Sequence, residues 1–222
     1  MTSTRIISTP YGDARLVANR ARTPLATLLL SHGAGVGIDT PDLEALAKGL
    51  PRHGITVLRL EQPWRVAGRK VATAPATLDA ALRATADVIR PRTPMVVGGR
   101  SAGARSAARS ARTLGAAGCL ALAFPLHPPG RPEKSRLDEL RRARVPTLVI
   151  QGERDSMGRP EEFPAGVDLC VVPNADHSFK VPKRADVSQA QALAIIVEAT
   201  LEWIVRDIAG NPVRMGKGNQ IS

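Results

Sequence analysis

One stretch near the middle of the chain joins a strand, a sharp turn and a helix within a few residues. An apolar run beginning at Met95 leads directly into the turn Gly99 to Gly103 (Gly-Arg-Ser-Ala-Gly). This Gly-x-Ser-x-Gly spacing is typical of a serine, here Ser101, held exposed on a turn so tight that only glycine fits two residues before and after it. Alanines at helical spacing follow, from Ala104 to Ala111. A strand that turns at once into a helix indicates a sheet with helices packed against it.

The rest of the chain repeats this alternation of strand and helix signals. Strands are expected at residues 5–8 and 14–18, which form an opening hairpin, and at 26–31, 55–60, 118–124, 147–151 and 168–172. Helices are expected at 41–50 after Thr40, from Thr77 to about residue 89, and from Ser188, where Ser188 and Gln191 suit a capping box. Continuous apolar strands separated by helices predict an α/β fold, with a mostly parallel central sheet covered by helices on both faces.

The length and composition fit one folded domain. With 222 residues, 43% of them hydrophobic, the chain can bury a substantial core. We expect a single domain over residues 1–222, with an ordered core at about 5–208 and a loose tail from 210 to 222. The apolar runs are too short for a membrane span, and the N-terminus lacks the apolar segment of a signal peptide. We therefore expect a cytoplasmic protein with no membrane partner.

The net charge of +11 raises the question of nucleic-acid binding. Most of the 31 basic residues are arginines spread along the whole chain, and only 3% of the residues are aromatic. Aromatic platforms on which single strands could stack are therefore scarce. We expect no specific nucleic-acid partner and attribute the charge to compositional bias.

A glycine-containing loop follows the first buried strand. It runs from Ser31 to Gly35 (Ser-His-Gly-Ala-Gly) and leads into the next helix. Acyl transfer at a serine needs two backbone N–H groups aimed at the oxyanion that forms on the substrate. One of them comes from the residue after the serine, here Ala102, and the other from an earlier strand-to-helix loop. We expect Ala34 N–H as the second donor, with Gly33 as its close rival and a plain glycine turn as the alternative.

An acid and a histidine follow Ser101 along the chain. Asp155 lies just beyond an apolar strand, and His177 lies between the last expected strand and the last helix. Both positions are at the carboxyl ends of parallel strands, the edge at which such sheets place their sites. His177 would take the proton of Ser101, and Asp155 would orient the imidazole. Glu153 and Asp176 are weaker candidates for the acid, because Asp155 better fits the turn beyond the strand.

The serine turn, the acid and the histidine together resemble the α/β-hydrolase superfamily, over about residues 5–208. The compact size resembles the dienelactone-hydrolase-like branch, although dienelactone hydrolases proper carry a cysteine where this chain has Ser101. The segment Phe124 to Gly130 and the basic loop Trp64 to Lys70 resemble a family of small hydrolase-fold proteins. That family includes testis-expressed proteins and a subunit of a histone-acetyltransferase complex. The resemblance implies an α/β-hydrolase fold and also implies that non-catalytic members exist.

Two loops are candidates for the walls of a substrate site. The segment 124–137, where larger hydrolases insert a cap domain, is short and rich in proline, so we expect no large cap. The basic loop would favour an anionic acyl or alcohol group if it faces Ser101; otherwise it is a solvated loop. His127, in the segment 124–137, is either a substrate contact or a structural residue. The candidate substrate contacts are Gly33, Trp64, Arg65, Arg69, Lys70 and His127.

The sequence therefore predicts a serine hydrolase that cleaves small ester or thioester substrates through an acyl-enzyme, without a cofactor. No metal site is expected, because the four histidines lie far apart and none of them stands at metal-ligand spacing. Cys119 and Cys170 lie in apolar runs and are expected to be core residues. The competing hypothesis is a catalytically idle hydrolase-fold module that binds other proteins.

Overall fold

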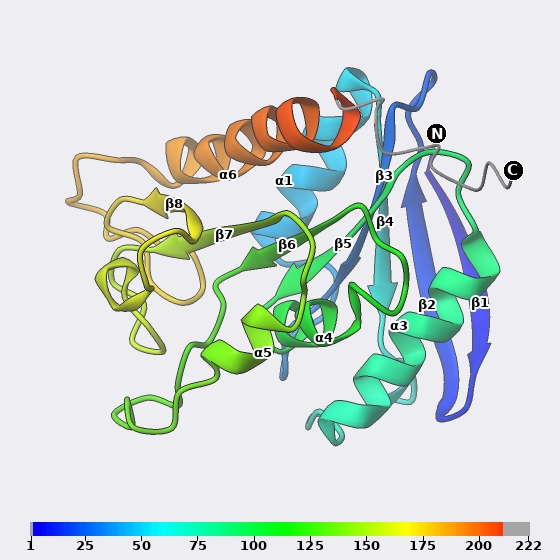
Figure 1. Cartoon of the computed structure of the whole chain (residues 1–222), viewed down its shortest axis with the longest axis horizontal. Helices are drawn as coiled ribbons and strands as arrows, with labels where there is room; N and C mark the ends of the chain where they lie inside the picture. The colour runs from blue at the N-terminus through cyan, green and yellow to red at the C-terminus, as the bar shows by residue number, and fades with distance from the viewer. Residues whose placement is uncertain (1, 211–222) are drawn as a thin grey trace, which may run out of the picture.

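The computed structural model describes residues 2–210, which form one eight-stranded sheet with helices on both faces (Figure 1). The strand order is β1-β2-β4-β3-β5-β6-β7-β8. The opening hairpin β1–β2 is antiparallel and pairs antiparallel with β4, while the strands from β4 to β8 all run parallel. The predicted α/β fold with a mostly parallel sheet is confirmed.

The strands lie close to the expected positions. They are β1 (Thr2–Thr9), β2 (Gly12–Asn19), β3 (Ala26–Ser31), β4 (Ile55–Glu61), β5 (Met95–Arg100), β6 (Gly118–Leu122), β7 (Thr147–Gly152) and β8 (Asp168–Val172). β6 ends two residues earlier than expected, because Ala123 adopts a φ of 44°, which extended backbone does not allow. The central strands are buried on both sides, as continuous apolar runs in a parallel sheet require.

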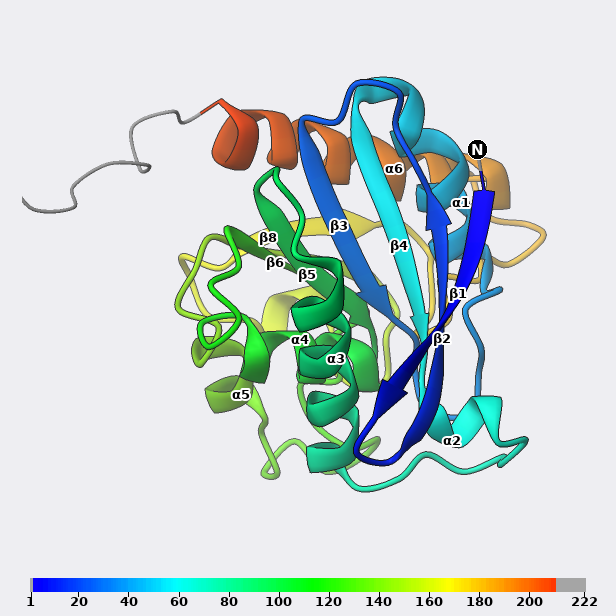
Figure 2. The ribbon, with the colours of Figure 1, turned by 90° about the vertical axis from the view of Figure 1, so that its right-hand side faces the viewer.

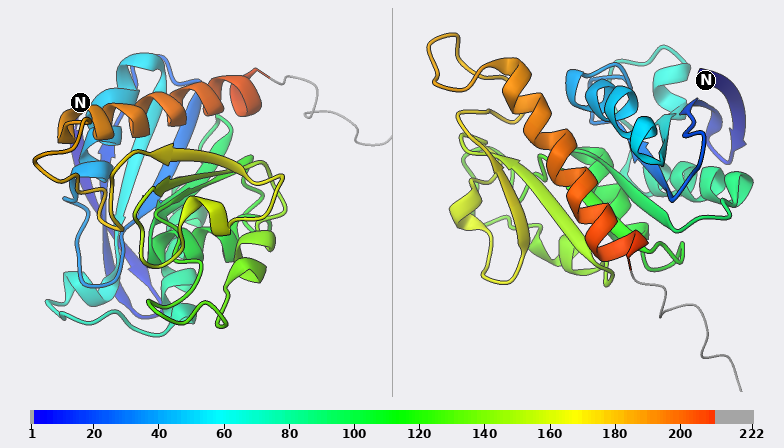
Figure 3. Two further views of the ribbon diagram at one scale, coloured as in Figure 1. Left: turned by 90° about the vertical axis from the view of Figure 1, so that its left-hand side faces the viewer. Right: turned by 90° about the horizontal axis from the view of Figure 1, so that it is seen from above.

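Helices cover the two faces of the sheet. They are α1 (Pro41–Gly49), α2 (Pro63–Val66), α3 (Pro75–Ile89), α4 (Ala102–Ser110), α5 (Leu137–Arg141) and α6 (Gln189–Trp203), with short 3-10 or π turns η1 (Leu50–His53), η2 (Pro160–Glu162) and η3 (Ile204–Ala209). α1 and α6 lie side by side on one face, and α3 and α4 on the other (Figures 1 and 3). Each pair closes its own apolar core, around Leu46 and Ile196 on one side and Leu82 and Ala107 on the other.

The expected N-cap residues agree with the structure at some helices and not at others. Ser188 is the N-cap of α6 and forms the expected capping box with Gln191. Thr40 stands at the N-cap of α1, but its hydroxyl makes no capping bond. The expected cap Thr77 was wrong, because α3 begins earlier, with Pro75 at its first position and Ala74 as N-cap. Proline is well suited to the first helical position, since its φ is already helical and its missing N–H would have no partner there.

The connection between β6 and α5 holds no further helix or strand, so no cap domain covers the sheet edge here. None of the helices described is long and apolar enough to cross a membrane. Of the predicted tail at 210–222, all but Gly210 falls outside the described residues.

The capping box of α6 leads to a stability prediction. Replacing Ser188 by alanine removes the hydroxyl that accepts from Gln191 N–H, and we expect a loss of about 1 kcal/mol in the free energy of unfolding. Thr40→Ala is the matched control, because its hydroxyl caps nothing, and it should cost clearly less. Urea titration of both variants measures the difference; equal losses would contradict the capping role of Ser188.

Candidate active site

Ser101 occupies the turn between β5 and α4 in a strained backbone conformation. Its φ is 53° and its ψ is −112°, a combination that side-chain-bearing residues rarely adopt. The Ser101 N–H donates to Leu122 O at 2.9 Å, which ties the turn to the end of β6. The expected sharp turn is therefore present, and it carries the serine at the carboxyl edge of the parallel strands.

The two glycines of the turn are required by close packing against β3. A Cβ on Gly103 would lie 2.8 Å from His32 O, and one on Gly99 would lie 2.7 Å from the carbonyl carbon of Gly103. Both would also clash with Ser31 O. Real Cβ atoms do not approach backbone this closely, so no larger residue fits either position without moving the strand.

His177 bonds to both of its predicted partners. Its Nε2 lies 3.0 Å from Ser101 Oγ, and its Nδ1 lies 2.8 Å from Asp155 Oδ2. Because an ionised carboxylate only accepts, Nδ1 carries the proton and Nε2 is free to accept from the serine hydroxyl. The weaker acid candidates bond elsewhere: Glu153 accepts from Asn174 N–H, and Asp176 from backbone N–H groups of its own turn. The geometry thus joins Ser101, His177 and Asp155 in one chain of hydrogen bonds.

Gln151, which the sequence analysis did not single out, holds the acid. It is fully buried at the end of β7, and its Nε2 donates to Asp155 Oδ2 at 2.9 Å and to Gly158 O at 2.7 Å. Its Oε1 accepts from Phe124 N–H at 2.9 Å. The other oxygen of Asp155 accepts from Met157 N–H at 2.8 Å. These donors stabilise a carboxylate that has no contact with solvent. The signal in the sequence was a glutamine directly after the apolar run from Leu148 to Ile150.

The loop after β3 runs directly beside the serine. A Cβ on Gly33 would lie only 3.3 Å from Ser101 Cβ. His32 fixes this loop, because its Nε2 accepts from Gln62 N–H at 3.0 Å and its Nδ1 donates to Gly33 O at 2.8 Å. Burial lowers the pKa of His32, which keeps the ring neutral for both bonds. Because the peptide is trans, Ala34 N–H points opposite to the Gly33 carbonyl that His32 holds.

The expected substrate contacts fall into two environments. Trp64 is buried with its ring edge-to-face against His32, at 5.4 Å between ring centroids. The helix α2 follows β4 and packs against β2 (Figure 2). A cavity of about 250 Å³ lies beside it. Trp64 and Arg69 line it, together with Tyr11 and Gln62. Arg65 is half-buried and Lys70 is exposed.

His127, by contrast, is engaged within the protein. Its Nδ1 lies 2.8 Å from Pro128 O, and its Nε2 lies 2.9 Å from Glu162. Hydrogen bonding to the Pro128 carbonyl, and then to Glu162, raises the pKa of His127. These bonds favour the structural alternative for this residue.

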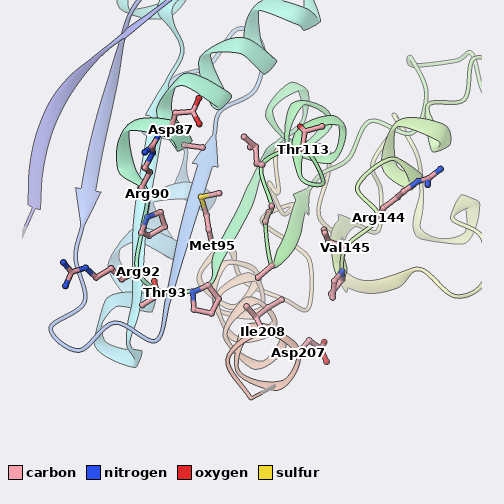
Figure 4. A pocket seen from close by; sticks show the side chains of 18 residues that line it. Asp87, Arg90, Arg92, Thr93, Met95, Thr113, Arg144, Val145, Asp207 and Ile208 are labelled. Carbon is pink, nitrogen blue, oxygen red and sulfur yellow. The ribbon is translucent and has the colours of Figure 1, made fainter. Parts of the chain in front are cut away.

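A larger cavity, of about 1070 Å³, lies at the amino-terminal ends of the parallel strands, opposite to Ser101 (Figure 4). Met95 at the start of β5 and Pro146 just before β7 line it, with Arg92, Arg144 and Ile208 around them. Since Ser101 follows the opposite end of β5, this cavity takes no part in the candidate site. Within residues 2–210 no cluster of three or more His, Cys, Asp or Glu side chains could hold a metal ion.

A family model described as an alpha/beta hydrolase domain matches residues 24–205. Solved structures with a similar fold include a serine hydrolase without lid from Xanthomonas campestris (19% identity, TM-score 0.67, covering 91% of this chain and 94% of that one). A dienelactone hydrolase from Anabaena variabilis is 18% identical, with a TM-score of 0.71 and coverage of 92% and 97%. The esterase domain of a Rhodothermus marinus protein is 14% identical, with a TM-score of 0.68 and coverage of 93% and 98%. At these identities the likeness concerns the fold.

The bonds of Gln151 predict a large cost for its removal. Gln151→Leu leaves Phe124 N–H and Gly158 O buried without partners, and we expect a loss of about 3 kcal/mol in the free energy of unfolding. Gln62→Leu, between β4 and α2, is the matched control. It is equally buried, but its Oε1 has no partner among the described residues, so about 1 kcal/mol is expected. Similar denaturation midpoints for the two variants would argue against the network around Gln151.

Proposed function

Because the chain belongs to the alpha/beta hydrolase domain family, we propose that it is a serine hydrolase with Ser101 as nucleophile, His177 as general base and Asp155 as the acid. The observation that carries the proposal is the hydrogen-bond chain from Ser101 Oγ through both ring nitrogens of His177 to Asp155. A protein that only binds partners would have no need for a strained serine backbone beside a correctly oriented imidazole.

The proposed reaction is acyl transfer in two steps. His177 Nε2 takes the hydroxyl proton as Ser101 Oγ attacks the substrate carbonyl carbon. Ala34 and Ala102 N–H would donate to the oxyanion, and Asp155 would stabilise the imidazolium. The imidazolium returns the proton to the leaving alcohol or thiol as its bond to the carbonyl carbon breaks, which leaves an acyl-enzyme. Water, activated by His177 in the same way, then releases the acid and restores Ser101.

Two observations support a substrate class. No helix or strand of a cap domain lies between β6 and α5, and Gln62, which lines the small cavity beside α2, donates to Ser31 Oγ at the end of β3 at 2.9 Å, so small ester or thioester substrates fit best. Arg69 lines that cavity and is exposed, so it can attract a negatively charged acyl or alcohol group. We therefore propose small esters or thioesters, anionic ones included, as substrates, with Gly33, Trp64, Arg65, Arg69 and Lys70 around them.

Removing the nucleophile tests the reaction. Ser101→Ala should lower kcat/KM for p-nitrophenyl esters by roughly 10³-fold or more, because the acyl-enzyme can no longer form. A fluorophosphonate probe should label the unmutated protein at Ser101, as identified by mass spectrometry. Ser178→Ala, which changes a serine next to His177, should keep both activity and labelling. Folded protein that neither hydrolyses esters nor reacts with the probe would favour the non-catalytic module.

Charge reversal at Arg69 tests the substrate class. Arg69→Glu should lower kcat/KM for a negatively charged ester by roughly fivefold at low salt and leave a neutral ester of equal chain length nearly unchanged. At 0.1 M salt, where screening acts over about 10 Å, the difference should shrink. Arg92→Glu, which makes the same change at the opposite edge (Figure 4), is the control and should affect neither ester. If the two esters respond alike to Arg69→Glu, the loop does not select for charge.

A further inference from the structure

Arg100 connects the serine turn to the loop that carries the base. It is the last residue of β5 and directly precedes Ser101, yet its side chain is only 6% exposed. Its Nη2 donates to the backbone carbonyl of His177 at 3.0 Å. One residue is thus covalently next to the nucleophile and hydrogen-bonded to the backbone of the base.

Asp42 provides the counter-charge for this buried cation. It lies in the first turn of α1, with 1% of its side chain exposed, and its Oδ2 is 3.4 Å from Arg100 Nε. Burial raises the pKa of Asp42, and the charge of Arg100 opposes that shift. The contact is an ion pair without a well-aligned hydrogen bond, since neither carboxylate oxygen has such a partner among the described residues. Burying an unpaired arginine would strongly destabilise the folded state. The charge of Asp42 therefore allows Arg100 to stay buried next to the His177 backbone.

We propose that Arg100, held by Asp42, is a positioning residue that sets the place of His177 relative to Ser101. This inference rests on the proposed function. The His177 loop connects β8 to α6 and contains no regular element of its own. Ala175 and Phe179 hold it to the apolar core, and the carbonyl of His177 itself is held by Arg100. Asp155 orients the ring from one side. Arg100 holds the backbone from the side of the nucleophile. A displacement of about 1 Å between reacting groups can cost about 10²-fold in rate.

The fork geometry of arginine is essential to this role. The planar guanidinium places Nη2 at 3.0 Å from the His177 carbonyl while its charge stays close to Asp42, with Nε 3.4 Å from Oδ2. Lysine has one compact ammonium and cannot reach both groups in this fixed geometry. Arg100→Lys therefore keeps the positive charge that Asp42 requires but loses the bond to the His177 carbonyl.

The test compares Arg100→Lys with Arg109→Lys. Arg109 is also mostly buried, at 13% exposure, and pairs with Asp79 and Glu139, but it lies along α4 and holds α4 to α3 and α5. We expect Arg100→Lys to lower kcat for a neutral ester about a hundredfold with KM within twofold, and to slow fluorophosphonate labelling of Ser101 by the same factor. Arg109→Lys should change neither, whatever it costs in stability. Arg100→Lys with kcat within threefold of the unmutated protein, or equal kcat losses in both variants, would overturn the proposal.

Hydrogen exchange separates this inference from the proposed function. Backbone amides of residues 174–179 should exchange several-fold faster in Arg100→Lys than in Arg109→Lys, even if the protein hydrolyses no ester. Asp42→Asn, which keeps the shape of the side chain but removes its charge, should increase exchange in the same segment and lower kcat about tenfold. Unchanged exchange in both Arg100→Lys and Asp42→Asn refutes the anchoring role. An unmutated protein that the probe does not label at Ser101 refutes the proposed function instead.

Discussion

The close contact between the serine turn and the end of β3 is the constraint on which the candidate site depends. Ser101 keeps an unfavourable backbone conformation because Gly99 and Gly103 let the turn sit directly against the Ser31 carbonyl. The same contact brings the loop after β3 alongside the serine, where a Cβ on Gly33 would lie 3.3 Å from Ser101 Cβ. Strain at one residue of this kind costs about 1–3 kcal/mol, which the sheet and the two apolar cores around it must offset.

Buried polar groups at this edge of the sheet are held in different ways. Asp155 receives a hydrogen bond on each carboxylate oxygen from the protein, in addition to that of His177. His32 stays neutral and uses both ring nitrogens to fix a backbone loop. Arg100 and Asp42 form an ion pair without good hydrogen-bond alignment. The first two arrangements give these buried groups hydrogen-bond partners, whereas the ion pair compensates charge alone. Each arrangement holds a different strand end or loop of the site.

The basic residues of the chain also divide into distinct roles. On α4, Arg105 and Arg109 pair with Glu139 and Asp79, so the helix that follows the serine turn is held to its neighbours by partly buried ion pairs. Arg69 lies in the exposed segment after α2 and lines the small cavity there. Some of the 31 basic residues thus serve packing, where carboxylates cancel their charge, whereas Arg69 keeps its charge at the surface.

The sequence predicted the parallel sheet and the order of Ser101, Asp155 and His177, because apolar periodicity and glycine-flanked turns are local signals. The strand bounds at 26–31 and 168–172 agree with the structure, and the cap of α6 at Ser188 agrees as well. Local signals could not predict three further contacts: the hydrogen bonds of Gln151, the ion pair of Arg100 with Asp42, and the hydrogen bond of His127 with Glu162. Each joins groups that belong to different elements or loops. Such contacts depend on how the strands and loops pack in three dimensions. The spacing of residues along the sequence does not determine the distance between side chains of different elements.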